Sequence, residues 1–179
     1  MPATVEVWDL PLRLYHWMLA AAVLIAYFTA NVFDTVHEVA GYAALALISF
    51  RLVWGFYGSR YSCFRSFIRP LRTVAPFVRQ LARGRVGHYL GLNPAGALMA
   101  LTLLVSLAVS TISGWMQLTE TYFGVAWVEA VHAYSSELVL ILAVVHVLGV
   151  LAMSAVQREN LVRAMLTGRK RRLRGRGDL

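Results

Sequence analysis

Two histidines on one apolar segment are the clearest sign of chemistry in this sequence. His132 and His146 lie fourteen residues apart within the segment 131–147. Fourteen residues make about four helical turns, so the two imidazoles share a face and stand ~21 Å apart along the axis. That separation covers most of the ~30 Å hydrocarbon core of a bilayer. Such a helix can hold two flat metal cofactors, one in each leaflet, if other helices supply a second ligand for each.

The composition is that of an integral membrane protein. Of the 179 residues, 59% are hydrophobic and 15% are charged, whereas a soluble domain has about 45–50% apolar and about 25% charged residues. We therefore predict an all-α fold, a four-helix transmembrane bundle with up-down-up-down topology. The four spans are expected at about 12–33, 37–57, 95–118 and 127–156. Residues 1–157 then form one domain, and residues 158–179 form a basic, solvated tail.

The segment 58–93 separates the second and third spans. Apolar residues recur in it at helical spacing between arginines. This pattern favours one or two short amphipathic helices in the membrane interface, broken near Pro70 and Pro76. A folded basic loop is the alternative.

The net charge of +8 follows the predicted topology. Seven of the seventeen Lys and Arg residues lie between Arg60 and Arg85, and eight lie between Arg158 and Arg176. Basic segments of membrane proteins stay in the cytoplasm. Both termini are therefore expected on the cytoplasmic side of a bacterial inner membrane, and no nucleic-acid partner is needed to explain the charge.

Two further histidines provide the missing second ligands. His16 lies near the cytoplasmic end of the first span, and His37 opens the second span on the periplasmic side. Because the fourth span runs inward, matching the histidines by depth pairs His37 with His132 and His16 with His146. The fifth histidine, His88, lies in the basic segment and is expected to be a surface residue.

Two imidazoles facing each other favour haem. Zinc takes four ligands, or three and a water molecule, whereas two histidines complete a six-coordinate haem, which suits electron transfer. Cys63 is the only cysteine, so covalent haem attachment and an iron–sulfur cluster held by this chain alone are not expected.

Three other residues are candidates for contact with the cofactors. Arg13 and Arg51 are the only basic residues outside the two basic segments, and we expect one or both to pair with haem propionates. Snorkelling of these side chains to the headgroups is the alternative. Gly41 follows His37 by one turn and would let a neighbouring helix or a flat ring approach.

The ordered motifs resemble those of the prokaryotic di-haem cytochrome b561 group, which is related to the cytochrome b subunits of nickel–iron hydrogenases. They are Tyr15-His16-Trp17, His37-Glu38, Arg51-Leu52-Val53-Trp54-Gly55, Asn93-Pro94, the His132/His146 pair, Arg158-Glu159-Asn160-Leu161 and Thr167-Gly168-Arg169-Lys170. The resemblance implies two non-covalent b haems held by His16, His37, His132 and His146. It also implies electron transfer between quinone and a redox partner, often periplasmic, such as a dehydrogenase or hydrogenase subunit. Separately, the charge of the acidic outer turns suits a basic cytochrome c as partner; ordinary solvated turns are the alternative. The acids in these turns are Asp34, Glu38, Glu120 and Glu129.

Two other functions stay open at this stage. One is a superoxide:ubiquinone oxidoreductase, which the resemblance allows because some members of the group carry out this reaction. The outer turns here, however, have no Lys or Arg to attract an anion. The other is a structural membrane subunit whose histidines contact neighbouring helices. A homodimer is open as the assembly.

Overall fold

The computed structural model describes residues 4–68, 70–84, 87 and 89–171. Helices dominate this part of the chain, and the only sheet in it has two short strands. In chain order the elements are β1 (Thr4–Glu6), α1 (Leu10–Thr29), α2 (Asp34–Tyr57), α3 (Phe64–Phe67), the 3-10 helix η1 (Leu71–Thr73), α4 (Val74–Ala82), α5 (Pro94–Gln117), α6 (Ala126–Gln157), α7 (Leu161–Thr167) and β2 (Arg169–Arg171).

Four helices, α1, α2, α5 and α6, are long and apolar enough to cross a membrane. They have 20, 24, 24 and 32 residues, and they begin and end within a few residues of the predicted spans. The all-α fold with four membrane-spanning helices is therefore confirmed. Apolar side chains are widely exposed along these helices, as at Phe28 (73%) and Val105 (62%). Lipid tails would cover such side chains in a membrane.

Side-chain caps fix where several helices begin. Asp9, Asn93 and Asn160 each accept a hydrogen bond from the backbone amide three residues later, at 2.8, 2.7 and 2.7 Å. A side-chain oxygen before a helix satisfies one of the amides that the first turn leaves without a partner. These caps explain why α1, α5 and α7 begin where they do.

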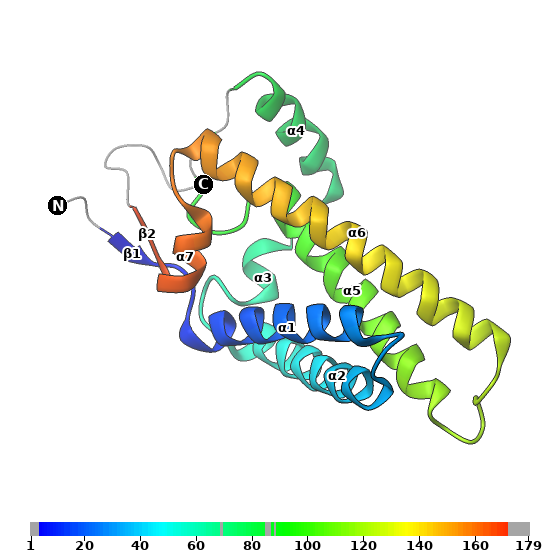
Figure 1. Ribbon diagram of the computed structural model, residues 1–179. Coiled ribbons are helices and arrows are strands. Elements are labelled where there is room, and N and C mark those ends of the chain that lie inside the picture. Colours follow the sequence, from blue (N-terminus) through cyan, green and yellow to red (C-terminus); the bar gives the residue numbers. More distant parts are fainter. Residues whose placement is uncertain (1–3, 69, 85–86, 88, 172–179) are drawn as a thin grey trace. The chain divides into compact units, whose positions relative to one another are not determined.

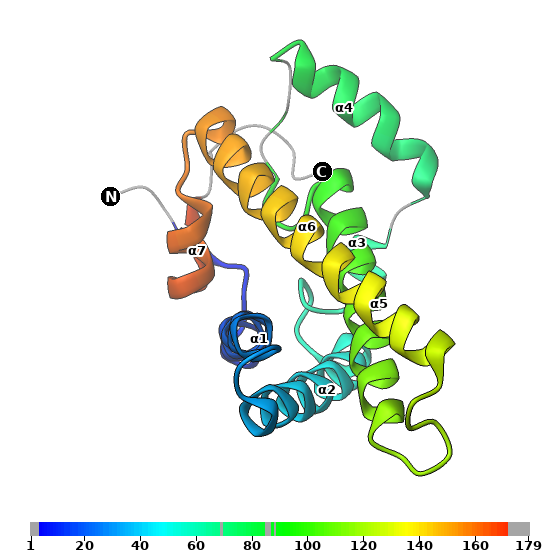
Figure 2. The same ribbon diagram turned by 45° about the vertical axis from the view of Figure 1, so that its right-hand side comes forward.

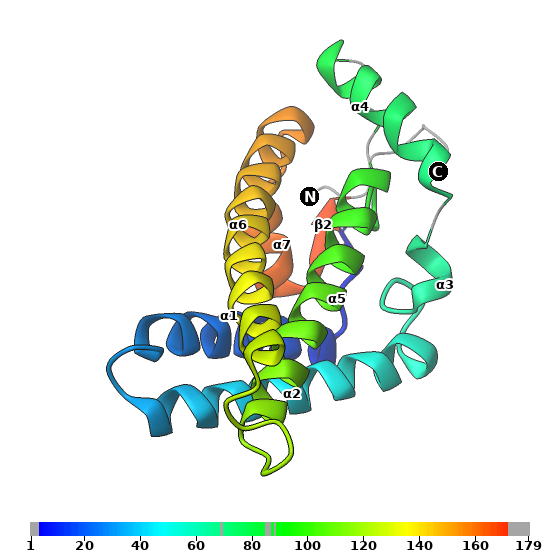
Figure 3. The ribbon, with the colours of Figure 1, turned by 90° about the vertical axis from the view of Figure 1, so that its right-hand side faces the viewer.

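The chain divides into two compact units. The first unit comprises residues 1–13, 54–101 and 144–179, and the second comprises residues 14–53 and 102–143. In the second unit the helical hairpin of α1 and α2 runs antiparallel (Figures 1 and 3), and α5 and α6 form a second hairpin (Figure 2). A buried cluster forms its core, comprising Leu19, Ala22, Ala44, Ile48, Leu107 and Val139.

The first unit contains the two termini of the described chain. β1 pairs antiparallel with β2, so that Thr4 faces Arg171 and Val5 faces Lys170. The basic tail predicted from residue 158 contains the ordered elements α7 and β2, and Lys170, which was expected to be solvated, is only 5% exposed. Residues 172–179 of that tail lie outside the described residues.

The basic segment between α2 and α5 contains α3, η1 and α4. In α4, Phe77 is buried against the ring of Tyr89, with centroids 5.8 Å apart, while Val78 and Arg79 are exposed. The segment is thus helical and α4 is amphipathic. Pro70 precedes η1, as the predicted break requires. The break expected at Pro76 is wrong, because Pro76 lies in the first turn of α4, where the missing N–H costs no helical hydrogen bond.

Candidate functional site

The second unit brings two of the predicted ligand histidines together. His37, in the first turn of α2, and His132, in the second turn of α6, have ring centroids 6.1 Å apart and planes at 89°. Both side chains are half-buried. We call these two residues the outer histidine pair.

A backbone carbonyl orients each ring of the outer histidine pair. The Nδ1 of His37 lies 2.8 Å from the carbonyl oxygen of Ala26, and the Nδ1 of His132 lies 2.8 Å from that of Ser110. A carbonyl can only accept, so Nδ1 is the donor in both rings. In the neutral imidazole this leaves a lone pair on each Nε2, the arrangement typical of a histidine that binds a metal.

The separation of the two rings fits a shared metal. Two metal–nitrogen bonds of about 2 Å plus the distance from each Nε2 to its ring centre add up to about 6 Å between centroids. The observed 6.1 Å matches this sum. Two imidazoles with oriented rings are the axial set of a six-coordinate haem, whose porphyrin provides the other four nitrogens.

Two glycines beside the outer histidine pair have different surroundings. A Cβ on Gly114 of α5 would lie 2.8 Å from Cε1 of His132, so the backbone of α5 supports that ring directly. A Cβ on Gly41, one turn after His37, would meet no atom within 4 Å. The surroundings of Gly41 thus leave room for the flat ring that the sequence predicts there, whereas Gly114 has no room for a side chain.

Serines tie α5 to α6 beside His132. The hydroxyl groups of Ser110 and Ser136 are 2.7 Å apart, and the same Ser110 provides the carbonyl for His132. The sequence gave no sign that the carbonyl of Ser110 meets His132. Nor did it indicate Ala26, because every residue has a carbonyl and only the rotation of a helix decides which one meets a ring.

The other two predicted ligands, His16 on α1 and His146 on α6, are both half-buried. His16 belongs to the second unit and His146 to the first, so their pairing stays a prediction. Near His16, the rings of Tyr15 and Phe50 are in contact with centroids 6.4 Å apart. This contact joins the start of α1 to the part of α2 that carries Arg51, which is only 7% exposed.

The remaining predicted residues have mixed outcomes. Arg13 donates from Nη1 to the carbonyl oxygen of Leu166 at 2.8 Å, a contact that ties α1 to α7 and that the sequence did not indicate. Its pairing with a propionate, and that of Arg51, stay predictions. His88 lies outside the described residues.

Asp9 is a second residue whose role the sequence did not reveal. Its carboxylate accepts hydrogen bonds from the Ser62 hydroxyl at 2.5 Å and from the Trp54 indole at 3.3 Å, besides the cap to Leu12. Burial alone would raise the pKa of this carboxyl, but the hydrogen bonds, including one from Ser59, hold the pKa below the usual 3.8. An aspartate two residues before Pro11 was the available signal, since such residues often cap helices.

The four long apolar helices define a class, that of multi-pass helical membrane proteins. Comparison with family models identifies the family within this class. Residues 7–168 match the model described as prokaryotic cytochrome b561, so the chain belongs to that family. Neither the comparison with curated proteins nor that with solved structures found a match. Membership makes the chain a multi-pass bacterial membrane protein of haem-dependent electron transport.

Proposed function

We propose that this protein is a di-haem b-type cytochrome that carries electrons across the membrane between the quinone pool and a periplasmic redox partner, such as a cytochrome c or a dehydrogenase subunit. The observation that carries the proposal is the outer histidine pair, with both Nδ1 atoms bonded to carbonyls and 6.1 Å between ring centroids. A bound six-coordinate haem supplies reversible one-electron transfer.

In this proposal the second haem is held by His16 and His146. Support comes from the spacing on α6, a continuous helix that carries both His132 and His146. Fourteen residues at a rise of about 1.5 Å separate the two levels by ~21 Å, enough for one haem in each leaflet. Arg51 also lies fourteen residues after His37, on the same face of α2, and is buried. Its guanidinium would pair with a propionate of the second haem.

The orientation follows from the distribution of basic residues. The turns at residues 30–33 and 118–125 have no Lys or Arg, while the first and last residues and the segment 58–93 belong to the basic side. Both termini are therefore cytoplasmic in this proposal, and the outer histidine pair is periplasmic.

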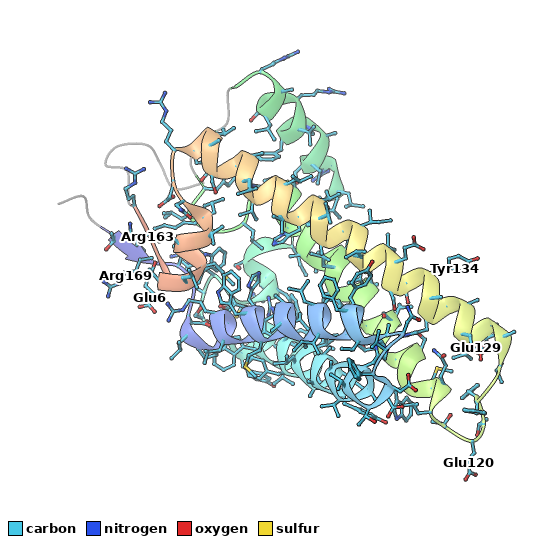
Figure 4. The ribbon with its side chains drawn as sticks, viewed as in Figure 1. Glu6, Glu120, Glu129, Tyr134, Arg163 and Arg169 are labelled. Atoms are coloured by element: carbon cyan, nitrogen blue, oxygen red, sulfur yellow. The ribbon has the colours of Figure 1, made fainter. Side chains whose placement is uncertain are left out.

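A periplasmic partner would meet an acidic surface. Glu120 and Glu129 are exposed beside the turn between α5 and α6, with Tyr134 one turn further along α6 (Figure 4). A basic cytochrome c would be attracted to such a surface, with a rate that falls as salt increases. The acidic turn also makes this face a poor collector of superoxide, so electron transfer to or from a protein partner is the better-supported function.

The haem content of the purified protein tests the proposal. We expect b-type bands in the reduced-minus-oxidised spectrum and two haems per polypeptide by pyridine haemochrome assay. His88→Ala should keep both haems and provides the matched control. A protein without b-type bands would refute the redox function, and one haem per chain would refute the second site. Quinone reduction with superoxide as the only donor would instead support the oxidoreductase alternative.

A further inference from the structure

A basic pocket in the first unit has no part in the haem sites. It has a volume of about 700 Å³ and is lined by residues of the segment 158–171 together with Thr4 of β1. Arg158, Arg163 and Arg169 line it and are exposed. Figure 4 shows Arg163 and Arg169 extending from α7 and β2.

These three guanidinium groups are available to a ligand. Within the part of the chain that the structure describes, none of them makes a hydrogen bond or an ion pair through its side chain. Arg171, which also lines the pocket, donates from Nη2 to the carbonyl of Arg158 and fixes the rim. Arginine forks of this kind match the oxygens of a phosphate group.

Acidic groups near the pocket do not neutralise it. Glu159 lines it, and its Oε1 accepts a hydrogen bond from the backbone amide of Arg171 at 2.7 Å. Glu6 faces Arg169 across the two-stranded sheet. Against these two carboxylates stand Arg158, Arg163, Arg169, Arg171 and Lys170, so the pocket keeps a positive charge.

The location of the pocket identifies the source of the phosphate. It follows directly on α6, whose last residue, Gln157, ends a membrane-spanning helix. On α7, Val162 and Leu166 are 39% and 59% exposed and lie four residues apart, on one face of the helix. A short helix with an exposed apolar face beside arginines lies naturally at the boundary between headgroups and acyl chains.

We propose that this pocket binds the phosphate headgroup of an anionic phospholipid, with Arg158, Arg163 and Arg169 holding the phosphate and Val162 and Leu166 contacting the acyl chains. Basic pockets at the ends of membrane helices recognise anionic lipids in this way. The proposal rests on the membrane-spanning fold and is independent of the haem assignment.

Native mass spectrometry of the detergent-purified holoprotein tests the site. Phosphatidylglycerol and phosphatidylcholine with identical chains are added separately, and bound lipid is counted. We expect at least a tenfold preference for phosphatidylglycerol. The variant Arg158→Gln/Arg163→Gln/Arg169→Gln should abolish it, and Arg163→Gln alone should weaken it about fivefold.

The matched control removes three exposed arginines from the other basic segment, as Arg65→Gln/Arg72→Gln/Arg79→Gln. It should keep the preference, and the far-UV circular dichroism and unfolding temperature of each variant report that the protein is folded. Equal loss in both triple variants would overturn the proposal in favour of diffuse charge attraction. Equal binding of the two lipids would also overturn it, and so would displacement of the lipid by inorganic phosphate at equal concentration, which would indicate a site for free phosphate.

Discussion

The outer histidine pair and the terminal clasp, which we define as β1, α7 and β2, hold polar groups in an apolar protein by different means. In the outer pair, backbone carbonyls of neighbouring helices orient His37 and His132. In the clasp, Lys170 is buried through a bond from Nζ to the carbonyl of Tyr89 at 3.2 Å and lies over the Trp8 ring at 5.7 Å. The first arrangement leaves one nitrogen on each ring free for chemistry, whereas the second uses its charged group for structure.

The largest effect is expected from a substitution in the outer histidine pair's surroundings, at Gly114 beside His132. Gly114→Ala puts a methyl group 2.8 Å from Cε1 of His132 and must displace the ring. We expect the affinity for the outer haem to fall about tenfold to a hundredfold, as when other supports of metal ligands are lost. Titration of the apoprotein with haem measures this change.

The control for that experiment is Gly149→Ala on α6, where a Cβ would meet no atom within 4 Å. Unchanged binding of the outer haem is expected. If both substitutions weakened it equally, the steric explanation for Gly114 would fail.

Gly41 provides a sharper test of the space beside His37. Gly41→Leu contacts no protein atom near its Cβ, so the stability of the apoprotein should change little, while the outer haem should bind about tenfold more weakly because the side chain fills its slot. Thermal unfolding and haem titration are compared for this variant and for Ala43→Leu, an exposed position on the same helix. Undiminished haem binding in Gly41→Leu would show that no ring approaches this glycine.

Substitution of Asp9 should have a smaller effect than the glycine substitutions, and it should change the stability of the protein but not its affinity for haem. Asp9→Asn weakens the cap of α1 and the bond to Ser62, at a cost of about 1–2 kcal/mol at pH 7. Because the folded pKa lies below the unfolded value, the charged carboxylate stabilises the folded protein above about pH 4, and this contribution is lost as the pH falls through the folded pKa. Unfolding in detergent at pH 7 and pH 3.5 should show the gap between variant and wild type closing.

Asp34→Asn is the matched control, because Asp34 is an exposed acid at the start of α2. It should cost less than Asp9→Asn at pH 7. A gap for Asp9→Asn that stays constant with pH would contradict the role assigned to the Asp9 carboxylate.

The smallest effect is expected at Lys170. Burial lowers the pKa of its amine below the usual 10.5, while Glu159 raises it in part. The folded protein therefore loses this proton before the unfolded chain does, and wild type should gain stability relative to Lys170→Met as the pH rises toward 10.5. Unfolding temperatures of wild type and Lys170→Met at pH 8 and pH 10 test this expectation. A fall in the unfolding temperature of wild type relative to the variant would contradict the burial of the charged amine.

The two regions differ in how much of their structure can be predicted from the sequence alone. Hydropathy and helical period were sufficient for the four spans, since both are local properties of the chain. The pairing of β1 with β2 joins residues from opposite ends of the sequence, and no local sequence pattern predicts it. The acceptor carbonyls of Ala26 and Ser110 depend on helix rotation, which residue types do not encode. Pro76 was misread because a proline in a first turn looks like a break until the start of the helix is known.

In the proposed function, two histidine pairs at different depths hold two haems. Difference spectra of the single variants His37→Ala, His132→Ala, His16→Ala and His146→Ala test it most directly. We expect His37→Ala and His132→Ala to remove one and the same spectral component, and the other two variants to remove the second. Loss of the same component in His16→Ala and His132→Ala would contradict it.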